Sequence, residues 1–222
     1  MASAGPERPP GRLITIEGVE GAGKSTQVEL LRRWLAARGR PVVATAEPDG
    51  TPVGAAIRAL LGTASPSPGT EAFLFAASRA EHVATVIRPA LARGADVVSD
   101  RFADSTVAYQ GHGRGVPLEV IAELNRLACG DLRPVLTIVL DLDVAAGLRR
   151  VAARRGHAGP GGVADPFERL AVEFHERVRK GYWAIRDREP DRVVLVDADR
   201  PPPLVAADVA AVVAQRLGLD AP

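Results

Sequence analysis

The chain has 222 residues, 46% of them hydrophobic, which suits a single domain with one buried core. Its 28 Lys and Arg nearly balance its 27 Asp and Glu, and a net charge of +1 gives no reason to expect a nucleic-acid partner. The lone Cys129 excludes an intramolecular disulfide and fits a reducing, cytoplasmic setting. No apolar run is long enough to span a membrane. Residues 1–11, rich in Pro and Gly, are expected to be a disordered tail before a single domain at 12–218.

A glycine-rich turn follows the first predicted strand, residues 13–16, and precedes a helical pattern over residues 27–37. From Gly18 to Ser25 it fits the spacing of a phosphate-binding loop, G-x-x-x-x-G-K-[ST]. Glycines let successive amide N–H groups turn inward around a phosphate, and a helix start adds its positive dipole end. We expect Lys24 to reach the outer phosphates and the serine to hold Mg²⁺. The strand-to-helix context disfavours the alternative of a purely structural turn.

The rest of the chain alternates strand-length apolar runs with helical patterns. Further strands are predicted at 41–46, 95–99, 135–140 and 192–196. Helices are predicted at 53–61, 71–93, 118–129, 144–155, 167–188 and 204–217, with Pro89 bending the second of these near its end. Because the strands are apolar throughout, both faces of the sheet should be covered. The sequence therefore predicts an α/β fold, a doubly wound five-stranded parallel sheet with helices on both faces.

Three further groups of residues suit phosphoryl-transfer chemistry. Asp100 follows a buried strand and could hold Mg²⁺ or its waters, or could cap a helix instead. Phe75 and Arg79 share one helix face, where they could bind a heteroaromatic base; a core Phe beside a surface Arg is the simpler alternative. Arg154 and Arg155 stand at the start of a glycine-rich segment that could close over phosphates. Alternatively, they only interact favourably with the dipole at the C-terminal end of their helix. The four histidines show no metal-ligand spacing.

Three segments closely resemble the bacterial thymidylate kinases. They are EGVEGAGKSTQ at 17–27, EPDGTPVG at 47–54 with Arg58, and DRFADSTVAYQG at 100–111. The resemblance runs from about residue 12 to the C-terminal helix. It implies a P-loop nucleoside monophosphate kinase fold and transfer of the γ-phosphate of ATP to dTMP with Mg²⁺, in dTTP biosynthesis. Members of this family are typically homodimers paired through helices.

The resemblance also implies roles for individual residues. Phe75 would stack on thymine, Arg79 and Gln110 would bind its edge, and Tyr109 would lie against the deoxyribose. The implied acceptor site comprises Glu47, Arg58, Phe75, Arg79, Arg101, Ser105, Thr106, Tyr109 and Gln110, with Arg58 and Arg101 on the phosphate. The implied ATP site comprises Gly18, Val19, Glu20, Gly21, Ala22, Gly23, Lys24, Ser25, Thr26 and Arg150. The implied Mg²⁺ site comprises Ser25, Asp100 and Glu47.

The family has two variants, which differ in whether the transition-state arginine lies in the phosphate loop or in a lid. Gly21 occupies the loop position here, so the chain resembles the lid-arginine variant, with its lid at about residues 154–166. Arg150, near the lid, would face adenine. The catalytic residues implied in this way are Lys24, Glu20, Arg101, Arg154 and Arg155.

Three positions depart from the family pattern. Ala46 stands where arginine is usual, Asp49 where glycine is usual, and Asp165-Pro166 where Asp-Arg is common. A lost cation and an added anion near the acceptor phosphate are expected to weaken dTMP binding unless Arg58 and Arg101 suffice. Two alternatives therefore stay open: a P-loop kinase with another small acceptor, and a catalytically silent nucleotide-binding regulator.

Overall fold

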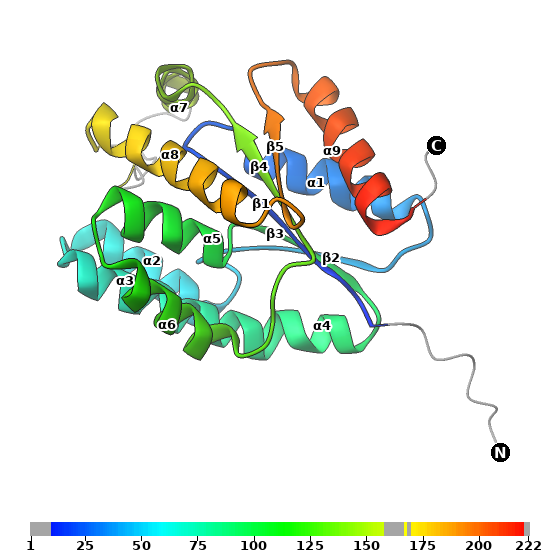
Figure 1. Cartoon of the computed structure of the whole chain (residues 1–222), viewed down its shortest axis with the longest axis horizontal. Helices are drawn as coiled ribbons and strands as arrows, with labels where there is room; N and C mark the ends of the chain where they lie inside the picture. The colour runs from blue at the N-terminus through cyan, green and yellow to red at the C-terminus, as the bar shows by residue number, and fades with distance from the viewer. Residues whose placement is uncertain (1–9, 158–166, 168–169, 220–222) are drawn as a thin grey trace.

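The computed structural model describes residues 10–157, 167 and 170–219. Its strands form one parallel sheet in the order β2-β3-β1-β4-β5 (Figure 1). Their bounds are β1 Leu13–Gly18, β2 Val42–Ala46, β3 Asp96–Asp100, β4 Leu136–Asp141 and β5 Val193–Asp197. The order reverses at β1, and ligands of such sheets bind at the carboxyl ends of the strands beside the reversal. The predicted five-stranded parallel sheet is confirmed.

Helices cover both faces of this sheet, as predicted. The α-helices are α1 Lys24–Ala36, α2 Pro52–Thr63, α3 Pro68–His82, α4 Arg88–Ala92, α5 Ala103–Thr106, α6 Leu118–Cys129, α7 Val144–His157, α8 Val172–Arg188 and α9 Pro202–Leu217. Two π-helical segments, η1 Val83–Ile87 and η2 Val107–Gly113, lie between them. Helices α1 and α9 pack on one face of the sheet, and α4, α5 and α8 pack on the other (Figure 1). No helix within the described part of the chain is both long and apolar enough to cross a membrane.

The central strands β1 and β4 are buried, and their paired hydroxyls Thr15 and Thr137 hydrogen-bond at 2.7 Å across them. Such a bond satisfies polar groups that would otherwise be costly to bury. Cys129 is also buried, and that burial raises the pKa of its thiol to about 11. It therefore behaves as the small buried hydrophobe that a lone helical cysteine suggests.

The structure differs from the predicted elements at three places. The long helix predicted at 71–93 contains η1, because Pro89 has no N–H and its ring crowds the carbonyl of the preceding turn. The helix predicted to start at Phe167 begins only at Val172. No helix is predicted at 103–113, yet α5 and η2 occupy this stretch. The last two differences both affect the site described next.

Candidate active site

The phosphate-binding loop lies between the central strand β1 and α1. Gly18, Gly21 and Gly23 have φ angles of 138°, 76° and 92°, a region that side chains other than glycine rarely adopt. Lys24 is buried, and its Nζ donates to the carbonyl oxygens of Gly18 at 3.1 Å and Val19 at 2.9 Å. Burial, with the nearby Arg101, lowers the pKa of the lysine. The ammonium is thus held against the loop that it is predicted to serve.

Backbone packing explains why the loop carries glycine at position 21. A Cβ built on Gly21 would lie 2.2 Å from the carbonyl oxygen of Gly147 in α7. A Cβ on Gly147 would in turn lie 2.3 Å from the carbonyl oxygen of Glu20. The loop and α7 therefore touch backbone to backbone. A side chain at position 21 requires α7 to move.

Ser25 and Asp100 meet beside this loop, as the predicted Mg²⁺ site requires. The serine hydroxyl donates to Asp100 Oδ2 at 2.6 Å, joining the start of α1 to the end of β3. A hydroxyl and a carboxylate are oxygen ligands of the kind Mg²⁺ prefers, with phosphate and water completing its shell. Within the described residues, no group of three or more His, Cys, Asp and Glu is arranged to hold a metal ion.

Glu47 is the third predicted metal ligand, but its carboxylate has other partners. It accepts from Arg79 Nε at 3.0 Å and lies 3.3 Å from His82 Nδ1. Its backbone N–H donates to the carbonyl of Asp100 at 2.9 Å, which ties the two strand ends together. A contact between Glu47 and Mg²⁺ stays a prediction.

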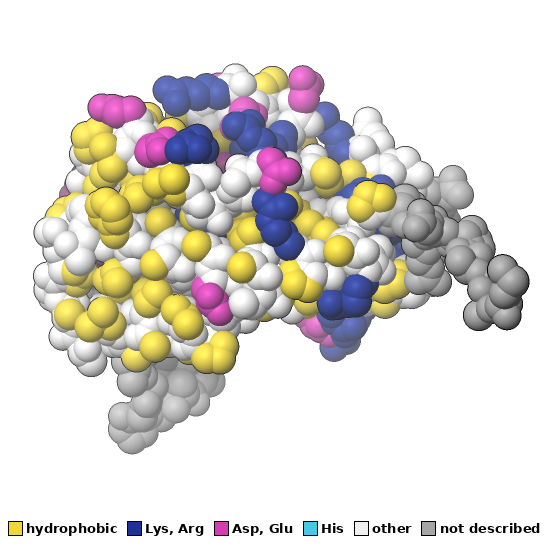
Figure 2. Space-filling model, turned by 90° about the horizontal axis from the view of Figure 1, so that it is seen from below, with side chains coloured by type: hydrophobic (Ala, Val, Ile, Leu, Met, Phe, Trp, Pro, Cys, Tyr) yellow, Lys and Arg dark blue, Asp and Glu magenta, His cyan; other side chains and the backbone are white. Residues whose placement is uncertain are grey.

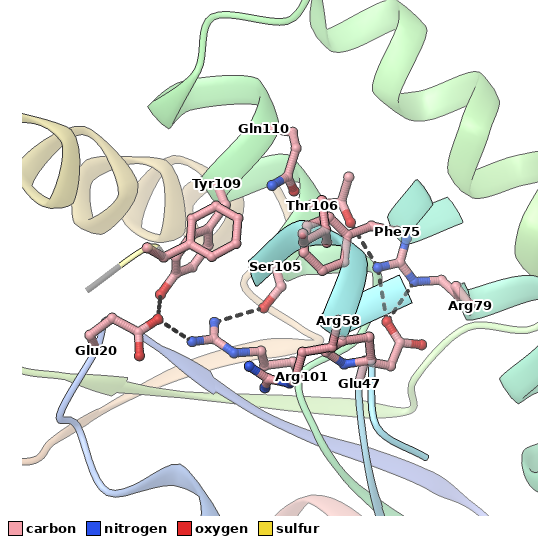
Figure 3. Close-up of a pocket in the computed structure, with 13 residues that line it drawn as sticks. Glu20, Glu47, Arg58, Phe75, Arg79, Arg101, Ser105, Thr106, Tyr109 and Gln110 are labelled. Atoms are coloured by element: carbon pink, nitrogen blue, oxygen red, sulfur yellow. Dashed lines mark hydrogen bonds and ion pairs between the residues drawn. The ribbon is translucent and has the colours of Figure 1, made fainter. Parts of the chain in front are cut away.

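A pocket of about 560 Å³ opens next to the loop (Figure 3). Every acceptor-site residue implied by the family resemblance lines it. The lining residues are Glu20, Glu47, Pro48, Arg58, Leu61, Phe75, Arg79, Arg101, Ser105, Thr106, Tyr109, Gln110 and Phe167.

Three aromatic rings form one wall of the pocket. The Phe167 ring lies 5.9 Å from that of Phe75 and 5.7 Å from that of Tyr109, measured between centroids. Phe167 was not predicted as a site residue, because the sequence pattern makes it the first residue of a regular helix rather than part of the turn before α8. Its position directly after the predicted lid, at about residues 154–166, is the sequence feature that could have indicated this.

Arg79 closes the base of the pocket and is only 1% exposed. Besides Glu47, it donates from Nη1 to Asn125 Oδ1 at 2.7 Å and from Nη2 to Thr106 Oγ1 at 2.7 Å. It also donates to the carbonyl of Phe102 at 3.2 Å. These partners fix the guanidinium in one orientation. Like Phe167, Asn125 is a residue of the site that the sequence analysis did not predict.

Gln110 is fixed by a different network. Its Nε2 donates to Glu71 Oε1 at 2.8 Å, and Arg114 Nη2 donates to the same carboxylate at 3.0 Å. Because a carboxylate only accepts hydrogen bonds, the amide nitrogen must face Glu71, and the amide oxygen is left to accept. Gln110 and Tyr109 both lie in η2, a helical segment that the sequence did not predict. This segment places the two side chains in the lining of the pocket.

At the other end of the pocket, Arg101 and Arg58 supply positive charge. Arg101 Nη2 lies 2.5 Å from Glu20 Oε1, which also accepts from the Tyr109 hydroxyl at 2.8 Å (Figure 3). Burial opposes ionisation of Glu20, but Arg101 and Lys24 outweigh it and hold the pKa of this carboxyl down at about 2. Glu20 is therefore an anion that links the phosphate-binding loop to the acceptor pocket.

Glu17, in β1, holds the turn that carries Arg101, and it was not among the predicted site residues. Among described residues Arg101 is the single non-glycine with positive φ, at 71°. The next residue, Phe102, donates its N–H to Glu17 Oε1 at 2.8 Å. Ser105 and Tyr182 hydroxyls donate to Oε2 at 2.6 and 2.9 Å. Burial and the nearby Asp104 raise the pKa of Glu17 to about 7.

The predicted lid falls mostly outside the described residues. Arg150 in α7 donates to the Ala198 carbonyl and to Asp199 Oδ1, each at 3.0 Å, beside the loop after β5. Arg154 is exposed on the last turns of α7. The Arg155 side chain and residues 158–166, with Asp165-Pro166, are not described. The lid roles stay predictions.

The fold and this site together define a class of protein. A phosphate-binding loop at the centre of a parallel sheet, with a Ser–Asp pair on one side and a pocket with an aromatic wall on the other, is typical of P-loop kinases that act on small acceptors.

Comparison with known proteins narrows the class to one family. The sequence model of the thymidylate kinase family matches residues 16–209. The thymidylate kinase of Caulobacter vibrioides is 50% identical over 94% of this chain and 99% of its own length. That of Desulfovibrio desulfuricans is 48% identical over 85% and 88%. The crystal structure of thymidylate kinase from Ehrlichia chaffeensis superposes with a TM-score of 0.73 at 32% identity, covering 92% of this chain and 99% of that one. The chain belongs to the thymidylate kinase family.

Proposed function

We propose that this chain transfers the γ-phosphate of ATP to dTMP, giving dTDP and ADP. The observation that carries the proposal is the pocket itself, in which an aromatic wall and two arginines lie beside the phosphate-binding loop and are joined to it by Glu20. Family membership supports the same reaction. The reaction breaks the bond from the γ-phosphorus to its bridging oxygen and forms one to a phosphate oxygen of dTMP.

The loop from Gly18 to Thr26 would hold ATP through its amide groups. Lys24 would exchange its backbone acceptors for phosphate oxygens, and Arg150 would face adenine. Ser25 and Asp100 would hold Mg²⁺, directly or through water. When bound, Mg²⁺ would neutralise part of the negative charge of the phosphates.

The acceptor would lie in the pocket with thymine against Phe75 and deoxyribose against Tyr109, near Ser105 and Thr106. Gln110 presents an acceptor, its amide oxygen, to the N–H of the thymine ring. Arg79 Nη1 has a second N–H beyond the one given to Asn125, and it would donate to a thymine carbonyl.

At the reacting end, Arg58 and Arg101 would bind the acceptor phosphate. Glu20 would position Arg101, Lys24 would neutralise charge between donor and acceptor, and Arg154 or Arg155 would add positive charge from the lid. Little covalent chemistry is asked of these side chains, because positioning and charge neutralisation supply most of the rate of phosphoryl transfer.

We also propose that the chain forms a homodimer through the face made by α2, α3 and α6. Large apolar side chains are exposed there, with Phe73 at 62% and Leu127 at 64%, and Val53, Leu60 and Val120 around them. Figure 2 shows hydrophobic side chains gathered on the corresponding face. An exposed patch of this kind marks an interaction surface. Phe73→Asp is expected to turn a dimer into a monomer in sedimentation velocity, with the wild-type chain as the control; a monomeric wild type contradicts the proposal.

The reaction is tested with ATP, Mg²⁺ and a panel of nucleoside monophosphates in a coupled assay of ADP release. Turnover is expected to be faster with dTMP than with dUMP, UMP or AMP. A faster reaction with one of these would identify another acceptor, and ATP binding without turnover would identify a silent regulator. The cytoplasmic location predicted from the sequence stays a prediction.

A further inference from the structure

We propose that Asp49 competes with the acceptor phosphate for Arg58 and so sets the affinity for dTMP. The inference rests on the proposed function, because it takes Arg58 as a phosphate ligand. It identifies Asp49 as an affinity-determining residue that lies outside the pocket lining.

The cations of the pocket differ in how easily they could meet a new ligand. Arg79 is buried among protein partners. The Arg101 side chain is 18% exposed and is paired with Glu20. Arg58, at 42%, is the most exposed of the three. It is therefore the pocket cation that is most accessible to an incoming phosphate.

Asp49 pairs with this exposed cation. Its Oδ2 accepts from Arg58 Nε at 2.6 Å, and its own side chain is 45% exposed. A phosphate dianion that binds Arg58 must therefore share the guanidinium with a carboxylate or displace it. Sharing places two anions side by side, which raises the free energy of the bound state.

The backbone on both sides of Asp49 is fixed, so the carboxylate cannot simply drift away with its loop. Ser78 donates to the carbonyl of Pro48 at 3.3 Å, and Thr51 caps α2 by accepting from the N–H of Gly54 at 3.0 Å. The side chain can still rotate, because it lies near the surface. The ion pair of Asp49 with Arg58 thus acts as a latch: a dianionic phosphate breaks this pair when it binds, and a neutral ligand leaves the pair intact.

The test compares Asp49→Asn, which keeps the size of the side chain and removes its charge, with the wild-type chain. Isothermal titration is expected to give a Kd for dTMP about three- to five-fold lower in the variant, chiefly from the loss of one exposed ion-pair competitor. The Kd for thymidine, which has no phosphate, should not change. Asp131→Asn is the matched control, because it breaks the exposed pair of Asp131 with Arg88 and changes the net charge equally.

A double-mutant cycle with Arg58→Gln separates the latch from simple repulsion. In that background Asp49→Asn is expected to change the Kd for dTMP by less than about two-fold. If Asp49→Asn lowered the Kd for dTMP as much in the Arg58→Gln background as in the wild type, the latch would be wrong. An unchanged or higher Kd in the single Asp49→Asn variant would also overturn it. If the acceptor panel had instead favoured another monophosphate, the proposed function would fail while the same titrations could be run with that acceptor.

Discussion

Replacing Glu17 by glutamine is expected to change how the stability of this protein depends on pH. The carboxyl is completely buried, and its pKa is raised from 4.5 to about 7 by burial and by Asp104. A raised pKa means that the native state binds a proton more tightly than the unfolded chain does. The favourable contribution is therefore complete below pH 4.5 and is lost as the pH rises through about 7.

The size of the effect follows from the shift. One pKa unit corresponds to about 1.4 kcal/mol, so the full change is about 3 kcal/mol, and most of it falls between pH 5 and pH 8. Glutamine has the same shape and does not titrate. Its oxygen can accept from the N–H of Phe102, while the hydroxyls of Ser105 and Tyr182 can rotate to accept from its nitrogen.

Urea unfolding followed by circular dichroism at pH 5 to 8, at one protein concentration, measures the difference between wild type and Glu17→Gln. The wild type is expected to lose about 2 to 3 kcal/mol relative to the variant over this range. Glu173→Gln, at an exposed position in α8, is the control and should show no such slope. A difference that stays constant from pH 5 to 8 would mean that Glu17 is ionised throughout and that its hydrogen bonds outweigh its burial.

Three further predictions concern the site. Phe75→Ala is expected to raise the KM for dTMP by roughly ten- to a hundred-fold in steady-state kinetics, since stacking on a base is worth about 1 to 3 kcal/mol; an unchanged KM would exclude stacking. Gly147→Ala should weaken ATP binding measured by titration and leave dTMP binding intact, because its Cβ meets the Glu20 carbonyl 2.3 Å away and must push α7 from the loop. Replacing both Arg154 and Arg155 by Ala should lower kcat by about 10³-fold or more with little change in Kd for either nucleotide; a wild-type kcat in single-turnover experiments would refute the lid assignment.

The phosphate-binding loop and the sheet were predictable because their determinants are local. A strand, three glycines and a helix start within residues 13–27 need no information from the rest of the chain. The strand pattern gave the parallel sheet for the same reason, since apolar runs buried on both faces leave few other architectures. The acceptor residues came from the family resemblance, and the pocket brings all of them together.

Helical stretches near the site were less predictable. Residues 103–113 contain Asp, Ser, Thr and Gly, which have low helix propensity, and tertiary contacts with α8 hold them as α5 and η2. The start of α8 at Val172 rather than Phe167 follows from packing as well. The Phe167 ring stacks on Phe174 at 6.4 Å and meets Phe75 and Tyr109 instead of continuing a helix.

By itself the sequence determined the class of chemistry, phosphoryl transfer, because the residues of a phosphate-binding loop are consecutive in the chain. Only the tertiary structure decided how that chemistry is held in place. Glu17 meets Tyr182 across 165 positions of sequence, Gly21 meets Gly147, and the charge at Asp49 proves to face Arg58. Such contacts join segments that are far apart along the chain, and no local pattern of residues encodes them.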